Sequence, residues 1–111
     1  MNSKSEASMI KNEKEPLICS LTNVELKERK KTIEKFKSMV YEKNEIENGI
    51  VFKLEGADDN LESIMNLVKL ERKCCTFLTF DLRIQKDAYP LQVTISGPEG
   101  TRDFLIHELG L

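Results

Sequence analysis

The sequence predicts an α+β fold: a small antiparallel sheet of four to five strands with three helices packed on one face. The first observation is the order of patterns along the 111 residues, which reads strand, helix, hairpin, helix, hairpin, helix. The second is that the two hairpins are short, and short connections join antiparallel strands. The third is a composition of 40% hydrophobic and 32% charged residues, which is typical of one globular domain with a modest core.

The domain is expected to begin at residue 16. Residues 1–15 are polar and charged, offer almost no apolar surface, and are predicted to form a disordered tail. Residues 16–111 are then the single α+β domain. In its opening stretch Leu17, Cys19 and Leu21 alternate with their neighbours, which predicts a short strand with the Cys19 side chain facing the core.

A helix is predicted from Thr22 to about Val40. Thr22 and Glu25 have the spacing of a capping box, in which each side chain bonds the other's backbone N–H. An apolar stripe follows the helical period and consists of Leu26, Ile33, Phe36 and Val40. Arg29 falls inside this stripe, where a charge is unexpected.

Two hairpins and two further helices account for the rest of the chain. Asn48-Gly49 predicts a type I′ turn in the first hairpin, and residues 80–96 form the second. Between them a helix is predicted from the capping-box residue Asp59 to about Cys75 or Leu78. The last helix is expected over residues 98–110, with a proline in its first turn and a glycine at its C-cap.

Charge and hydropathy argue against several classes of function. The net charge is −2, from 17 basic and 19 acidic residues, whereas nucleic-acid binding needs a basic face. No apolar run is long enough to span a bilayer, and the N-terminus has no apolar signal core. We therefore expect no nucleic-acid partner, no membrane and a cytoplasmic location, in which the three cysteines are reduced. The odd cysteine count also argues against a closed disulfide framework.

The stretch around Cys74 and Cys75 carries the strongest functional signal. On a helical wheel Glu71 lies near the centre of an apolar face, with one cysteine on each side of it. An ionised carboxylate without partners is costly to bury, so Glu71 should pair with Arg29 or Arg72, or else be protonated. Residues three and four apart on a helix are neighbours, so both thiols should lie within reach of this carboxylate.

Gathered thiolates favour a soft metal or metalloid ion. Cys74 and Cys75 supply two sulfurs and Cys19 can supply a third, a set suited to copper(I), mercury(II) or arsenite. Buffering, sensing or delivery of such an ion is the function that this pattern favours. A structural zinc site fits less well, because there is no C-x-x-C pair and the single histidine, His107, lies in the last helix.

Two other interpretations remain open from the sequence. In a cysteine-dependent redox or thiol-transfer enzyme, Cys74 or Cys75 would react and Glu71 would relay a proton. A helix C-terminus and a neighbouring carboxylate both disfavour the thiolate that such chemistry needs. Alternatively, the cysteines are inert core residues of a structural or protein-interaction domain, and Glu71 is an ion-pair partner of Arg29.

The segment "ERKCCTFLTF", together with "CSLT" at Cys19 and the later "GPEG", resembles a family of small, largely uncharacterised bacterial proteins. That family carries an E-R-x-C-C-P-F-x-x-F-like segment and is associated with heavy-metal and metalloid resistance settings. The resemblance covers most of residues 17–110 and implies that five positions match the family's motif: Cys19, Glu71, Arg72, Cys74 and Cys75. Thr76 departs from the pattern, because proline is common at that position.

Overall fold

The computed structural model describes residues 23–86 and 89–111. Three helices and a four-stranded antiparallel sheet make up these residues, so the predicted α+β class is confirmed. Along the chain the elements are α1 (Asn23–Met39), β1 (Val40–Ile46), β2 (Gly49–Leu54), α2 (Asp58–Cys74), β3 (Thr79–Arg83), β4 (Leu91–Ser96) and α3 (Thr101–His107). The predicted tail over residues 1–15, the strand around Cys19 and the Thr22 cap lie outside the described residues.

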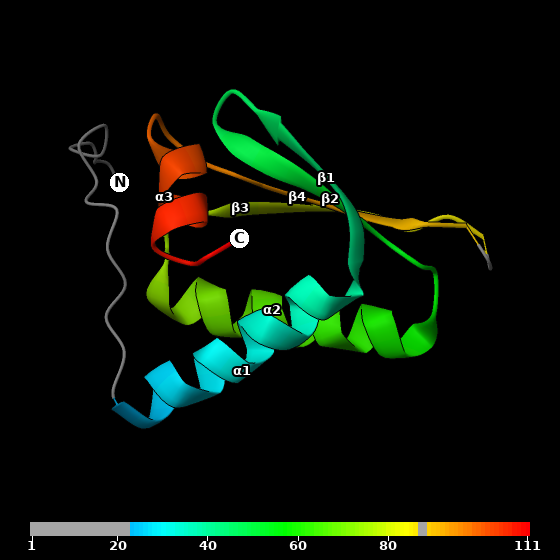
Figure 1. The fold of residues 1–111 in the computed structure, drawn as a ribbon, viewed down its shortest axis with the longest axis horizontal. Helices are drawn as coiled ribbons and strands as arrows, with labels where there is room; N and C mark the ends of the chain where they lie inside the picture. The colour runs from blue at the N-terminus through cyan, green and yellow to red at the C-terminus, as the bar shows by residue number, and fades with distance from the viewer. Residues whose placement is uncertain (1–22, 87–88) are drawn as a thin grey trace, which may run out of the picture.

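The strands are ordered β1-β2-β4-β3, so the two hairpins are joined through their second strands. Phe52 is opposite Val93 in the central β2–β4 pair, and both side chains are buried. Along these two strands buried residues alternate with partly exposed ones, so one face of the sheet packs in the core and the other is partly exposed to solvent. Helices α1 and α2 cross on one side of the sheet, and α3 lies beside its end (Figure 1).

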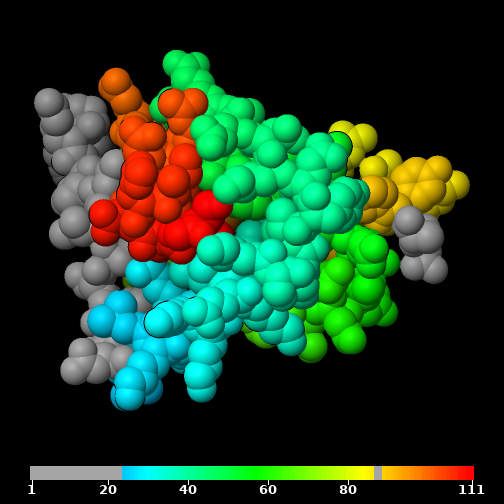
Figure 2. All heavy atoms as spheres, viewed as in Figure 1, coloured from blue at the N-terminus to red at the C-terminus, as the bar shows by residue number. Residues whose placement is uncertain are grey.

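The core joins this sheet face to the helices. Phe36 of α1 packs edge-to-face on Phe52 of β2, with ring centroids 5.1 Å apart. Phe104 and Leu105 of α3 are buried in the same cluster, as is Leu109 beyond the helix end. In the space-filling view α1 and β1 occupy the front of the molecule, with α3 beside them (Figure 2).

Four local expectations need correction. Leu26 of the predicted α1 stripe is 45% exposed, so the buried stripe consists of later residues such as Ile33 and Phe36. Helix α2 begins at Asp58 after the N-cap Ala57, whose side chain makes no capping bond, so the predicted capping box at Asp59 is wrong. Helix α3 begins at Thr101, beyond the proline, because Gly100 is the N-cap and takes a left-handed φ of 95°. Helix α3 also ends at His107, with Glu108 as its C-cap.

A fifth expectation that needs correction concerns the first hairpin. Its turn residues are Glu47 and Asn48, because Ile46 pairs with Gly49 and Gly49 already belongs to β2. Gly49 is also not among the glycines with positive φ, so no type I′ turn requires it. Its missing side chain instead makes room for the neighbouring strand, because a Cβ atom here would collide with the backbone carbonyl oxygen of Ile95.

We therefore expect Gly49→Ala to destabilise the protein by about 3 kcal/mol, because the collision is with the backbone of the paired strand β4, which cannot move aside as a side chain can. Gly110→Ala is the matched control. Gly110 has a φ of 70° but nothing within 4 Å of an added Cβ, so that variant should cost only about 1–2 kcal/mol of backbone strain. Urea unfolding of both variants measures the difference, and equal losses would contradict the steric role given to Gly49.

Within the described part of the chain, no helix is both long enough and apolar enough to cross a membrane.

Candidate metal centre

Glu71 lies on the buried face of α2. The buried residues of this helix recur at intervals of three or four and comprise Ser63, Ile64, Leu67, Glu71 and Cys74. The Glu71 side chain is only 1% exposed, so the helical wheel placed it correctly. A carboxylate in this position needs a charged or hydrogen-bonding partner.

Arg29 of α1 is that partner. Its Nε donates to Glu71 Oε2 at 2.9 Å, and its Nη2 donates to Oε1 at 3.2 Å. This two-point contact is the geometry in which guanidinium and carboxylate interact most strongly. Of the predicted alternatives the structure selects the pair with Arg29, whereas Arg72 is exposed at the surface. The unexpected charges in the two apolar stripes therefore neutralise each other across the α1–α2 interface.

The two cysteines lie beside this ion pair. Cys74 is the last residue of α2 and Cys75 is its C-cap, whose backbone N–H bonds the Glu71 carbonyl. Their sulfurs are 3.3 Å apart, and Arg29 Nη2 is 3.6 Å from Cys75 Sγ. One carboxylate oxygen of Glu71 and both sulfurs lie within 4.8 Å of one another, so these three residues could hold a metal ion. The predicted proximity of the thiols to Glu71 is confirmed.

The two sulfurs differ in redox state. Cys74 is a free, buried cysteine, whereas Cys75 is disulfide-bonded. The expectation of fully reduced cysteines is therefore wrong at Cys75. The 3.3 Å between the two sulfurs is far longer than a disulfide bond of about 2.05 Å, so the adjacent pair is not itself bonded. Cys75 can act as a thiolate ligand only after reduction.

Cys19, the third predicted sulfur ligand, lies outside the described residues. A site with three sulfurs thus stays a prediction.

A short anchored connection fixes the cysteines relative to the sheet. The N–H of Leu78 bonds the Cys75 carbonyl at 3.1 Å. The ring of Phe77 packs edge-to-face on that of Phe104, with centroids 5.0 Å apart. Gly97 of the facing strand end allows close approach, since a Cβ there would be 2.9 Å from the Phe77 carbonyl oxygen. The sequence analysis did not assign this anchor to Phe77, although its place directly after the predicted helix end was an available signal.

The electrostatics of the site keep the Cys74 thiol protonated. Burial raises the pKa of Cys74 above its ordinary value; the Arg29 charge lowers it, and the Glu71 charge raises it again. Removal from water has the largest effect because it disfavours the thiolate. Cys74 is therefore a poor spontaneous nucleophile near neutral pH.

This shift of the Cys74 pKa predicts a pH dependence of stability. The folded state holds the thiol proton more tightly than the unfolded state, so the stabilisation is fully present below the unfolded pKa and is lost above it. We expect the melting temperature of the wild type to fall more steeply from about pH 9 upward than that of Cys74→Ala, in which the thiol is absent. Parallel thermal scans measure this difference. Identical pH profiles would contradict the inferred shift.

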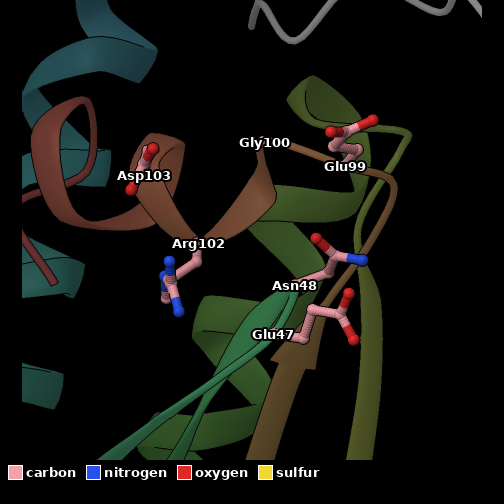
Figure 3. Close-up of a pocket in the computed structure, with 6 residues that line it drawn as sticks. All are labelled: Glu47, Asn48, Glu99, Gly100, Arg102 and Asp103. Carbon is pink, nitrogen blue, oxygen red and sulfur yellow. The ribbon is translucent and has the colours of Figure 1, made fainter.

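A surface hollow lies away from the cysteines, between the β1–β2 turn and the start of α3. It has a volume of about 580 Å³ and is lined by Glu47, Asn48, Glu99, Gly100, Arg102 and Asp103. Its side chains point in different directions and do not converge on one point (Figure 3). Arg102 instead donates to the Ile46 carbonyl at 3.3 Å, which ties α3 to the hairpin. We assign this hollow no binding role.

Comparisons of the chain with protein-family models, with curated proteins and with solved structures found no match. The function is therefore inferred from the geometry of Glu71, Cys74 and Cys75.

Proposed function

We propose that the protein, once reduced, binds a soft metal or metalloid ion through Cys74 and Cys75, in buffering, sensing or delivery of that ion. The observation that carries this proposal is the grouping of two sulfurs and a carboxylate oxygen within 4.8 Å of one another. Thiolates prefer soft ions, and mercury(II), arsenite and copper(I) are the candidates. Cys19 is proposed as a third ligand.

The ion pair with Arg29 gives Glu71 a supporting role. Both carboxylate oxygens already accept hydrogen bonds from the guanidinium group, so the carboxylate is held in place beside the sulfurs. Glu71 also fixes Arg29 near Cys75 Sγ. A positive charge at that distance favours the thiolate that an ion would bind.

A cytoplasmic location suits this proposal, because thiols are kept reduced there. Reduction would convert Cys75 from a disulfide-bonded residue into a ligand, so the redox state would control whether the site can be filled. The resemblance to a family associated with metal and metalloid resistance agrees with this function.

Titration of the reduced protein with mercury(II) tests the proposal. Sulfur-to-metal charge transfer should produce ultraviolet absorption that saturates at one equivalent. Cys74→Ser and Cys75→Ser should each lower it sharply, because a hydroxyl is a hard and poorly ionised ligand. Cys19→Ser should matter only in a three-sulfur site. Equal absorption from the wild type and the Cys74→Ser, Cys75→Ser double variant would reject the proposal.

Thiol–disulfide exchange is the second candidate function. The free Cys74 sulfur lies 3.3 Å from that of the disulfide-bonded Cys75, within reach of attack. The raised pKa of Cys74 opposes it, because the thiolate is the attacking species. Turnover of a small disulfide substrate without added metal would favour this candidate over ion binding.

A further inference from the structure

Strand β3 forms one edge of the sheet. Within residues 23–86 and 89–111 it pairs only with β4, so the backbone N–H and C=O groups on its other side have no strand opposite them. Such an edge is a template on which another strand can pair. The side chains of the edge strand decide whether that pairing is favoured or prevented.

The other edge strand, β1, has two features that prevent pairing. Its register is irregular between Val40 and Glu42, as at a β-bulge. Lys43 and Glu45 are opposite buried residues of β2, so two charges lie on the core side of this strand. Bulges and inward-pointing charges are common means by which proteins protect a sheet edge.

Strand β3 has neither feature in its ladder with β4. Phe80 and Leu82 are opposite buried residues of β4, so the apolar core face continues as far as this edge. Both side chains are only partly buried. Ile84, directly after the strand, is 55% exposed. Contiguous apolar side chains at the surface mark a site of protein association.

The flank of helix α2 next to this edge is apolar as well. Leu61 lines the same surface hollow as Ile84, which has a volume of about 390 Å³. Met65 and Val68 follow Leu61 at intervals of four and three residues, so all three lie on one side of the helix. Met65 is 39% exposed. Strand and helix therefore present one apolar strip along the β3 side of the protein.

We propose that this strip binds a second copy of the chain, with the two β3 strands paired antiparallel about a two-fold axis at Leu82. The strand is self-complementary about this residue. Asp81 is then opposite Arg83 of the second copy, and the symmetry forms this ion pair twice. Phe80 is opposite Ile84 in the same way. Opposite charges and apolar pairs directly across an antiparallel ladder stabilise it.

The other symmetric registers fit less well. An axis at Asp81 or at Arg83 places two like charges opposite each other, which is unfavourable. An axis at Phe80 leaves Ile84 beyond the strand of the second copy. Within the described residues neither Asp81 nor Arg83 forms an ion pair, so both can pair across the axis.

The chosen axis is perpendicular to the sheet, so it joins two four-stranded sheets into one and keeps the helices of both copies on the same face. The apolar flanks of the two α2 helices are thereby brought toward each other. Pairing at the strand edge and burial of these flanks both favour the dimer.

Sedimentation equilibrium of the full chain over a concentration series tests this interface. The protein is kept free of reductant, so that Cys75 stays disulfide-bonded as in the structure. We expect a reversible dimer of the 12.8 kDa chain. Asp81→Arg and Arg83→Asp should each weaken it on the order of 100-fold, because each places like charges opposite one another at two positions.

An equimolar mixture of these two variants should form a heterodimer, because the basic side chains of one then lie opposite the acidic side chains of the other. The double variant Asp81→Arg, Arg83→Asp should dimerise like the wild type for the same reason. Glu45→Arg, on the opposite edge, is the matched control and should leave the dissociation constant unchanged.

A wild type that stays monomeric throughout the series would overturn the inference, and so would a dimer that survives denaturant, because such a dimer is covalent. A dimer that the single variants leave intact, or a mixture that stays monomeric, would also overturn it.

Hydrogen exchange of the wild-type chain gives an independent readout that needs no variant. The β3 amides that point away from β4 should exchange more slowly at high than at low protein concentration, whereas the amides of β1 should not change. Equal exchange of the β3 amides at both concentrations would contradict pairing at this edge.

Discussion

Replacing Arg29 by methionine should lower the free energy of unfolding by about 3 kcal/mol. The variant leaves the Glu71 carboxylate, which is 1% exposed, without its charged partner, and removing one member of a buried ion pair typically costs 3–5 kcal/mol. We expect the lower end of this energy range because the Arg29 side chain is 12% exposed, so water can reach part of the site. Glu71→Gln should cost less, since the charge left behind is the more exposed guanidinium.

The exposed pair of Lys53 and Glu42 provides the control. The Lys53 Nζ and Glu42 Oε2 atoms are 3.4 Å apart and the side chains are 36% and 46% exposed, so Glu42→Gln should cost much less than either change in the Arg29–Glu71 pair. Urea unfolding of these variants and of the Arg29→Met, Glu71→Gln double variant completes a double-mutant cycle. A coupling energy near zero between Arg29 and Glu71 would contradict the ion pair as described.

Phe77→Ala should lower the free energy of unfolding by about 3–5 kcal/mol, the usual cost of deleting a buried aromatic ring. The ring is 7% exposed and packs on Phe104, so its loss also frees the connection that follows Cys75. We therefore expect faster alkylation of the Cys74 thiol in native protein. Iodoacetamide labelling followed by mass spectrometry measures that rate.

Phe80→Ala is the matched control for this prediction, because its ring is only partly buried on β3. It should cost less and leave the alkylation rate of Cys74 unchanged. The anchoring role of Phe77 would be contradicted if both variants accelerated alkylation equally.

Periodicity predicted the elements of the fold because burial repeats every second residue in a strand and about every 3.6 residues in a helix. The alternation over residues 91–95 predicted β4, and both hairpins are present. Helix starts were predicted less well, since they depend on single backbone conformations. Gly100 begins α3 through its left-handed φ, whereas the predicted cap at Asp59 forms no side-chain bond.

The glycine in the first hairpin shows a similar limit. Asn48-Gly49 has the composition of a turn, but Gly49 is needed because β4 lies against it. Which strand lies beside β2 is set by the whole sheet and cannot be read from residues 48 and 49 alone.

More features of the candidate site than of the structure around it could be predicted from the sequence. Two charges inside apolar stripes, Arg29 and Glu71, indicated a buried pair, and the helical period placed Cys74 and Cys75 beside it. The distance between the sulfurs and the packing of Phe77 on Phe104 depend on how α2 joins the sheet. These features follow from tertiary packing, which the pattern of one helix does not contain.

Native mass spectrometry of the reduced protein, with and without arsenite or mercury(II), tests the ion-binding function most directly. With an excess of a small monothiol present as competitor, we expect one added ion on each folded wild-type chain and none on the Cys74→Ser, Cys75→Ser double variant, in which the single thiol of Cys19 cannot chelate. An unmodified wild-type mass at saturating concentrations of both ions, or equal uptake by the double variant, would contradict it.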